Sequence, residues 1–275
     1  MGTFGLALGA GGARGIAHIH ALKALDDLGV KPEILAGTSI GAIIGSAYCS
    51  GMSGQEIEDY LVEKFDNPLR LLGEAMRIRP DSFEDFLRDG GLRIGEINLE
   101  RILDAFLPDQ VAECFEAFEI PIIAVATDYY AAEAKLFDAG PVKPALAASA
   151  AIPAVFLPVK VGERYYTDGS ATNPCPFDVL QGKADHLIAI DVSGGPLGTP
   201  TKRPRKIDAI YATSQLMQQS IVKYMLEHSP VAALLRPPVD RFRVLDFLET
   251  KAVLEETASL YEDVKRAVSQ ILQAS

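Results

Sequence analysis

Two short stretches of this sequence place a serine and an aspartate where they could carry out acyl-transfer chemistry, and the first is Gly37-Thr38-Ser39-Ile40-Gly41. It lies between an apolar run and an apolar segment rich in small residues. A sharp strand-to-helix turn lifts a serine hydroxyl clear of the backbone, at the cost of strained dihedrals, so that the oxygen can attack an acyl carbon. Gly37 and Gly41 suit such a turn, because side chains there would collide as strand and helix close on each other. The pattern predicts a nucleophile elbow at Ser39, with a plain strand-to-helix turn as the alternative.

The second stretch ends in a carboxylate, Asp168. The residues from Val155 to Asp168 are typical of a hairpin that turns at Gly162-Glu163, and they lead into Gly169. An Asp-Gly pair commonly does no more than form a turn. Here it follows a predicted strand, and α/β folds place functional groups at strand ends. Asp168 is therefore a candidate functional residue.

A glycine-rich loop, Gly9-Ala-Gly-Gly-Ala-Arg-Gly15, lies near the N-terminus between a short apolar run and an apolar helical segment. Gly11 and Gly12 leave consecutive backbone N–H groups uncovered beside a helix N-terminus, which suits an anion or a developing oxyanion. Arg14 adds positive charge there. The loop is compatible with an oxyanion hole or a dinucleotide pyrophosphate site, although it lacks the Gly-x-Gly-x-x-Gly pattern. A turn that only packs a helix on a strand is the third alternative.

The histidines and cysteines indicate neither a metal site nor a triad. His18 and His20, two residues apart on one helix, point to different faces, so we expect them to be packed or polar residues. The sequence nominates no histidine for a Ser-His-Asp triad. Cys49, Cys114 and Cys175 are widely separated without Cys-x-x-Cys spacing, which predicts free thiols.

The composition indicates which classes of binding partner are compatible with this sequence. The 275 residues carry 26 basic and 37 acidic side chains, a formal net charge of −11, which disfavours nucleic acid. The same charge repels an anionic membrane at long range, so lipid contact would need local apolar or basic patches. The most apolar runs, 34–49 and 144–159, are too short and too broken by glycine or proline to span a bilayer. No basic leader opens the sequence, and a cytoplasmic location is expected by default.

Alternation of strand and helix patterns predicts an α/β layered fold with a mostly parallel central sheet flanked by helices. The stretch 33–48 is expected to be a strand that passes through the turn at 37–41 into a helix. The other expected strands are 3–8, 120–127, 134–137, 155–168 as a hairpin, and 186–192, and the other expected helices are 16–28, 53–65, 99–106, 143–151, 207–225 and 252–272. The last two are expected to cover the core. Residues 66–100 are irregular and are interpreted as a cap or insertion, either facing lipid head groups or packed as ordinary amphipathic helices.

The glycine loop with Arg14, the elbow and the Asp168-Gly169 turn occur in the order and rough spacing of the patatin-like phospholipase family. The sequence resembles that family over at least residues 4–175, including Ala148-Ser-Ala-Ala-Ile-Pro153. The resemblance implies one patatin-like domain over 1–275, similar to single-domain bacterial members. It also implies a Ser-Asp dyad without a catalytic histidine, in which Ser39 is the nucleophile and Asp168 the base.

The resemblance assigns Gly11, Gly12 and Arg14 to the oxyanion loop, and the supporting motif positions are Ala10, Gly15, Gly37, Gly41 and Gly169. Two positions depart from the family pattern. Ala10 stands where the family has a glycine, but it keeps a backbone N–H. Ser170 stands where the family has alanine or glycine, and its hydroxyl could add a hydrogen bond to Asp168.

The activity implied is hydrolysis of acyl esters of phospholipids or lysophospholipids through an acyl-enzyme, with no metal and no other cofactor. An acyltransferase using the same serine is the first alternative, and a nucleotide-binding protein using the Gly9–Gly15 loop is the second. Peripheral membrane contact, oligomeric state and the choice of lipid are left open.

Overall fold

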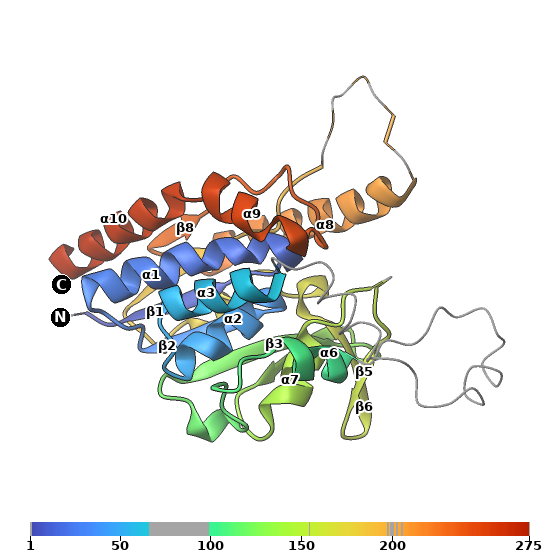
Figure 1. Ribbon diagram of the computed structural model, residues 1–275, viewed down its shortest axis with the longest axis horizontal. Coiled ribbons are helices and arrows are strands. Elements are labelled where there is room, and N and C mark those ends of the chain that lie inside the picture. The colour runs from blue at the N-terminus through green and yellow to red at the C-terminus, as the bar shows by residue number, and fades with distance from the viewer. Residues whose placement is uncertain are drawn as a thin grey trace.

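The computed structural model describes residues 2–65, 99–153, 155–196, 198, 201, 203–204 and 206–274, without the side chains of 206–208 and 274 (Figure 1). The cap or insertion predicted at 66–100 therefore falls almost entirely outside the described residues. Only its last two residues are described, and they begin helix α6 (Leu99–Phe106). The extent of the predicted domain, 1–275, stays a prediction.

The described strands are β1 (Phe4–Leu8), β2 (Ile34–Thr38), β3 (Ile122–Asp128), β4 (Glu133–Phe137), β5 (Val159–Val161), β6 (Arg164–Asp168), β7 (His186–Ile190) and β8 (Ala233–Leu235). They form one sheet, in which β1, β2, β3, β7 and β8 pair in parallel and β4, β5 and β6 pair antiparallel. The expected mostly parallel α/β fold is confirmed. β8 was not predicted, because three residues are too few to show a strand period.

The other described α-helices are α1 (His18–Leu28), α2 (Ile40–Cys49), α3 (Gly54–Phe65), α7 (Val142–Ser149), α8 (Lys206–His228), α9 (Thr250–Glu256) and α10 (Ser259–Ala274). Helices lie on both faces of the sheet (Figure 1). Leu6 and Leu8 of β1 pack into the larger core cluster, which contains residues of α1, α2 and α10. Ala7 points the other way, into a cluster with Phe177 and with Val222 of α8. Side chains of β1 thus alternate between two buried faces, as expected for a central parallel strand.

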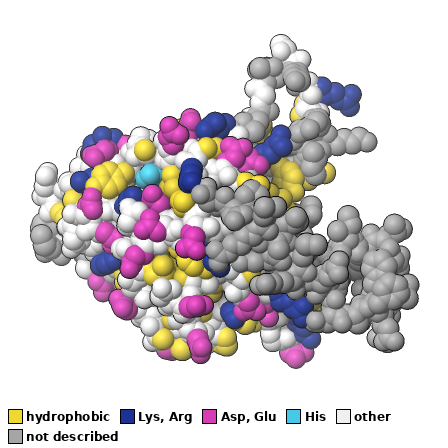
Figure 2. Space-filling view, in the orientation of Figure 1, with side chains coloured by type: hydrophobic (Ala, Val, Ile, Leu, Met, Phe, Trp, Pro, Cys, Tyr) yellow, Lys and Arg dark blue, Asp and Glu magenta, His cyan; other side chains and the backbone are white. Residues whose placement is uncertain are grey.

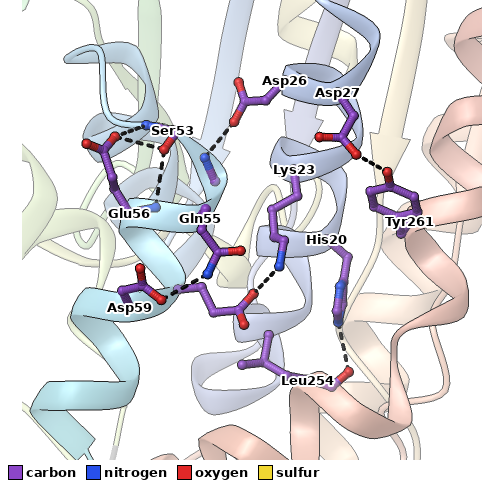
Figure 3. Close-up of polar contacts among 12 residues, drawn as sticks. His20, Lys23, Asp26, Asp27, Ser53, Gln55, Glu56, Asp59, Leu254 and Tyr261 are labelled. Carbon is purple, nitrogen blue, oxygen red and sulfur yellow. Dashed lines mark hydrogen bonds and ion pairs between the residues drawn. The ribbon is translucent and has the colours of Figure 1, made fainter.

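Figure 3 shows how α1 is held between α3 on one side and α9 and α10 on the other. The Asp26 carboxylate accepts the N–H of Gly54 at 2.6 Å, at the start of α3. On the opposite side, His20 Nε2 lies 2.8 Å from the Leu254 carbonyl, and the Tyr261 hydroxyl donates to Asp27. The predicted packed role of His20 is confirmed. Because α1 follows the glycine loop directly, these contacts also fix the position of that loop.

The N-terminus of α3 carries a capping box. The Ser53 hydroxyl accepts the N–H of Glu56 at 3.2 Å, and the Glu56 carboxylate accepts the N–H of Ser53 at 2.8 Å. The two side chains satisfy backbone donors that a helix start leaves unpaired. This local signal explains why the predicted start of the helix agrees with the structure to within one residue.

Near the C-terminus, the single helix predicted at 252–272 is instead two helices, α9 and α10. The Thr257 hydroxyl donates to the Val253 carbonyl at 2.7 Å, and the Leu260 N–H donates to the Thr257 carbonyl at 3.0 Å. α9 packs against the glycine-loop turn and α10 against α1. An unbroken apolar stripe cannot reveal the break, because both helices bury the same kind of face.

No helix among the described residues is both long enough and apolar enough to span a bilayer. Cys49, Cys114 and Cys175 are free thiols, as predicted.

Candidate active site

Ser39 occupies the turn between β2 and α2. It is the single residue between them, and its backbone has φ 56° and ψ −123°. A serine at positive φ is strained, because its Cβ crowds the backbone. In the described chain, Ala132 is the other non-glycine residue at positive φ. Ser39 is also buried, at 3% exposure. The strained strand-to-helix turn predicted from the sequence is therefore present.

The two flanking glycines are required for two different steric reasons. A Cβ at Gly37 would lie 2.5 Å from the backbone of Ala42, so strand β2 and helix α2 do close on each other there, as predicted. A Cβ at Gly41 would lie 2.2 Å from the carbonyl oxygen of Leu8. Its collision partner is the end of the neighbouring strand β1, and not its own strand. Gly41 therefore sets how closely α2 approaches the sheet.

Ser149, the last residue of α7, supports the elbow. Its hydroxyl accepts the backbone N–H of Ser39 at 2.9 Å and donates to the Val125 carbonyl at 2.6 Å. Ser149 is fully buried. Ser149 lies in the Ala148–Pro153 segment of the family resemblance, but no local pattern marks its role, because only the folded chain brings it 110 positions back to Ser39.

The pairing of β3 explains how Asp168 reaches Ser39. Val125 of β3 pairs with Thr38 of β2, and the next residue, Ala126, pairs with Asp168 of β6. β4 occupies the opposite edge of both β3 residues. Consequently β2 and β6 lie along the same edge of β3 and meet carboxyl end to carboxyl end.

This arrangement corrects one expectation about Asp168. The residue does lie at a strand end, but β6 is antiparallel, so the rule for carboxyl ends of parallel strands does not place it. Asp168 lies next to the carboxyl end of β2 because β6 runs along the same edge of β3 in the opposite direction and ends where β2 ends. Gly169 follows, where a Cβ would lie 2.2 Å from the Val125 carbonyl oxygen.

Asp168 is a buried carboxylic acid, at 2% exposure. Burial raises its pKa above the usual range, and hydrogen bonds from the Ser170 and Ser39 side chains and from the Ser170 backbone oppose that rise. The Ser170 N–H donates to the Asp168 carboxylate at 2.8 Å. Ser170, one of the two departures from the family pattern, thus contributes hydrogen bonds that moderate the basicity of the carboxylate.

Hydrogen bonds hold the backbone at the start of the glycine loop in place. The Gly9 N–H donates to the Ile190 carbonyl at 2.9 Å, and the Ala10 N–H donates to the Pro174 carbonyl at 2.8 Å. His18 Nε2 lies 2.9 Å from the Gly9 carbonyl. His18 is therefore packed, as expected. The N–H that Ala10 retains is already used, so it is not available to an oxyanion.

The next part of the loop presents free donors. Gly12 has φ 58° and begins a 3₁₀ turn over Gly12–Ala17, so α1 starts two residues later than predicted. The Ala13 N–H donates to the Val244 carbonyl at 2.8 Å. Within the described residues, the N–H groups of Gly11 and Gly12 donate to no partner. Gly15 packs the turn closely on α2, since a Cβ there would lie 2.2 Å from Ile40.

Arg14 is buried at 1% exposure, and its guanidinium is held in place. It donates to the Ser193 carbonyl and, with the Gln215 amide oriented so that its oxygen faces the guanidinium, to Gln215 Oε1 as well. Burial lowers the pKa of Arg14 to about 10, and the charges of Asp240 and Asp246 oppose that change. Arg14 therefore stays positively charged at neutral pH.

One cavity of about 130 Å³ brings these groups together. Its wall includes the serine, the aspartate and the loop, with apolar residues from three other segments: Ala10, Gly11, Gly12, Arg14, Ser39, Ile152, Pro153, Asp168, Ser170, Ser193, Ile210, Tyr211, Ser214, Gln215, Gln218 and Val244. None of the four histidines, all of which are described, lines it. A hydroxyl, a buried carboxylate and two free backbone donors around one space can support acyl transfer.

The sequence was compared with protein-family models and with known proteins. A family model described as patatin-like phospholipase matches residues 6–180. An uncharacterized NTE family protein of Mycobacterium bovis is 31% identical over 230 residues, 81% of this chain and 59% of the relative. The neuropathy target esterase of Drosophila melanogaster is 27% identical over 280 residues, 89% of this chain and 18% of the relative. The chain thus spans less than two thirds of the length of these curated relatives.

Among solved structures, that of VipD from Legionella pneumophila aligns with a TM-score of 0.49 and 13% identity, over 95% of this chain and 67% of that chain. The family model covers more than half of the present chain and contains the glycine loop, the elbow and the Asp168-Gly169 turn. The chain therefore belongs to the patatin-like phospholipase family.

Proposed function

We propose that this chain is a serine acyl hydrolase that cleaves acyl ester bonds of phospholipids or lysophospholipids through Ser39 and Asp168. The observation that carries the proposal is the shared cavity: a strained serine, a buried carboxylate and two glycines, Gly11 and Gly12, whose N–H groups have no partner among the described residues, line one space. Membership of a family described as phospholipases supports the lipid class of the substrate.

In the first half of the proposed reaction, the Asp168 carboxylate takes the Ser39 proton as Ser39 Oγ bonds to the ester carbonyl carbon. The carbonyl oxygen becomes an oxyanion, which the N–H groups of Gly11 and Gly12 stabilise. The bond from the acyl carbon to the leaving alcohol oxygen then breaks, and that oxygen takes the proton from Asp168. The product is an acyl-Ser39 ester and a free alcohol.

In the second half, Asp168 takes a proton from water as the water oxygen attacks the acyl carbon. The bond between the acyl carbon and Ser39 Oγ breaks, and Oγ recovers its proton from Asp168. A fatty acid leaves, and the enzyme returns to its starting state. Burial of Asp168 suits this role, because a raised pKa makes the carboxylate a better proton acceptor.

Arg14 has a positioning role in this proposal. Its guanidinium bonds to Ser193 and Gln215, so it holds the loop that precedes α1 against the wall of the cavity. Fork-shaped donors suit such a bridge. Apolar residues Ile152, Ile210 and Val244 on the same wall are suited to an acyl chain.

The acyltransferase alternative uses the same residues and differs only in the second acceptor. An alcohol that outcompetes water for the acyl-enzyme would give transfer products. The nucleotide-binding alternative is less favoured, because Gly11 and Gly12 line the same cavity as Ser39 and Asp168. A thermal-shift titration with NAD(P) would reveal such binding.

The test is hydrolysis of p-nitrophenyl acyl esters of graded chain length by wild type, Ser39→Ala and Asp168→Asn. We expect turnover in wild type to be lost in both variants, and a fluorophosphonate to label wild type but not Ser39→Ala. The matched control is Ser46→Ala, since Ser46 is a fully buried serine away from the cavity. Comparable rates in all four proteins would refute the dyad.

A further inference from the structure

We propose that an apolar rim, made of exposed side chains in three segments that each also contribute to the cavity wall, docks on a zwitterionic phospholipid surface. The rim consists of the exposed α8 stripe Ile210, Met217 and Tyr224, with Leu157, Leu245 and Leu248 from two loops. The proposal rests on the proposed function for its choice of partner, because a lipid hydrolase must take its substrate from an aggregate.

The first evidence is the outer side of α8. Ile210, Met217 and Tyr224 are seven residues apart and are 58%, 60% and 64% exposed. Residues at that spacing lie on nearly the same side of a helix, and 14 residues span about 21 Å. This apolar stripe begins at the cavity, since Ile210 is one of its lining residues. The covering role predicted for this helix is therefore only partly met, because Val222 packs on the core while the stripe faces solvent.

The second evidence is that two other segments also combine a residue in the cavity wall with exposed apolar side chains nearby in the sequence. Val244 lines the cavity, and the neighbouring Leu245 and Leu248 are 49% and 61% exposed. Pro153 also lines the cavity, and Leu157, four residues later, is 53% exposed. Figure 2 shows hydrophobic side chains gathered where the segment before α9 meets α8. Three separate parts of the chain thus each contribute a residue to the cavity wall and carry exposed apolar side chains nearby in the sequence.

Burial of large apolar side chains is favourable, so six of them left exposed in the segments that form the cavity wall favour a partner that covers them. The charges identify the kind of surface. The protein carries a net charge of −11, which repels an anionic bilayer. The rim itself mixes signs, with exposed Arg243 beside Asp240 and Asp246. A zwitterionic head group offers both charges, and insertion of apolar side chains supplies the binding free energy.

The experiment uses the full chain in a Ser39→Ala background, so that vesicles are not consumed. Phosphatidylcholine vesicles are sedimented with this protein and with additional Met217→Glu or Leu248→Glu substitutions. Neither residue lines the cavity. We expect each glutamate to reduce the bound fraction at least about fivefold, because a charge must leave water to insert. Binding of the parent should persist in 0.5 M salt, since salt screens charges but does not weaken apolar contact.

Leu216→Glu is the matched control. Leu216 is 50% exposed and adjacent to Met217, but one residue turns the helix by roughly 100°, which places Leu216 on the flank away from the cavity. This variant should bind vesicles like the parent. Equal binding by all variants would overturn the proposal. So would light scattering that shows the parent to be a dimer which Met217→Glu dissociates, because the stripe would then face a second copy.

A parallel assay separates this proposal from the proposed function. Met217→Glu with Ser39 intact should hydrolyse a soluble short-chain p-nitrophenyl ester at the wild-type rate and lose activity only on vesicles. If no ester is hydrolysed by any form but vesicle binding still depends on Met217 and Leu248, the proposed reaction fails and the docking surface stands. If the soluble ester is hydrolysed and vesicle binding is insensitive to these residues, the docking surface fails alone.

Discussion

The Ser149 hydroxyl accepts the backbone N–H of Ser39 at 2.9 Å, so a fully buried side chain on α7 holds the strained residue between β2 and α2. It also donates to the Val125 carbonyl at 2.6 Å. Ser149 therefore ties the elbow to β3, the strand along which β2 and β6 meet.

Ser149→Ala should lower the free energy of unfolding by about 1 to 3 kcal/mol, because it leaves the buried Ser39 N–H without an acceptor. We also expect kcat for a soluble ester to fall about 10-fold with little change in KM, since a misplaced nucleophile affects chemistry more than binding. Urea unfolding and steady-state kinetics measure the two effects. Ser46→Ala should be nearly neutral, because the buried Ser46 hydroxyl has no partner in the described part of the chain. Equal effects of the two substitutions would argue against a positioning role for Ser149.

Asp168→Asn should remove turnover and raise the melting temperature at pH 7. Burial raises the pKa of Asp168 in the folded state, so its contribution to stability is present below the ordinary carboxyl pKa and is lost as pH rises through the raised value. Asparagine does not ionise and avoids that loss. Melting curves at pH 7 and pH 4 should show the advantage of the variant shrinking as pH falls.

The same shift predicts the pH profile of wild type. As the base, Asp168 must be ionised, so kcat/KM should fall on the acid side with a midpoint above the ordinary carboxyl range. Asp185→Asn is a control of opposite sign, because hydrogen bonds from Thr3 lower the pKa of that exposed carboxylate and favour its charged form. It should slightly destabilise the protein at pH 7. A midpoint at or below the ordinary range would count against Asp168 as a buried base.

Gly41→Ala should cost about 3 kcal/mol or more in the free energy of unfolding. The new methyl group would lie 2.2 Å from the Leu8 carbonyl oxygen, on a central strand that cannot move aside. Denaturant unfolding gives the cost. Gly195→Ala serves as control, because its nearest neighbour would lie 3.5 Å away, an ordinary contact. A cost below 1 kcal/mol for Gly41→Ala would mean that α2 can shift away from β1.

His18 should make the protein sensitive to mild acid. Burial lowers the pKa of His18 to about 4, while hydrogen bonding to the Gly9 carbonyl and the charge of Asp191 oppose that change. The unfolded chain takes up a proton near pH 6.5 and the folded chain does not, so stability is lost as pH falls through this window. Between pH 7 and pH 5 the loss from this group is about 2 kcal/mol.

His18→Gln should therefore lose about 2 kcal/mol less than wild type when urea unfolding is repeated at pH 7 and pH 5. The amide can still donate to Gly9 but does not titrate there. An unchanged slope in His18→Gln would show that His18 is protonated inside the folded protein.

Local patterns in the sequence determined the elements that carry the site. Neighbouring residues alone were enough to predict β2, the turn and α2. The signals were the apolar run before Ser39, the glycines at 37 and 41 and the small-residue segment after Ser39. The same holds for the glycine loop and for the hairpin at Gly162, whose φ of 60° suits a tight turn. These motifs also carried the family assignment.

The tertiary structure alone decided what surrounds them. Ser39 and Asp168 come together because Val125 and Ala126 pair with two strands that meet end to end, a register that neither strand encodes by itself. Ser149 reaches Ser39 for the same reason. Likewise, the engagement of the Ala10 N–H and the exposure of the α8 stripe depend on distant segments. Period and spacing describe one element, whereas pairing and burial are properties of elements that have already packed together.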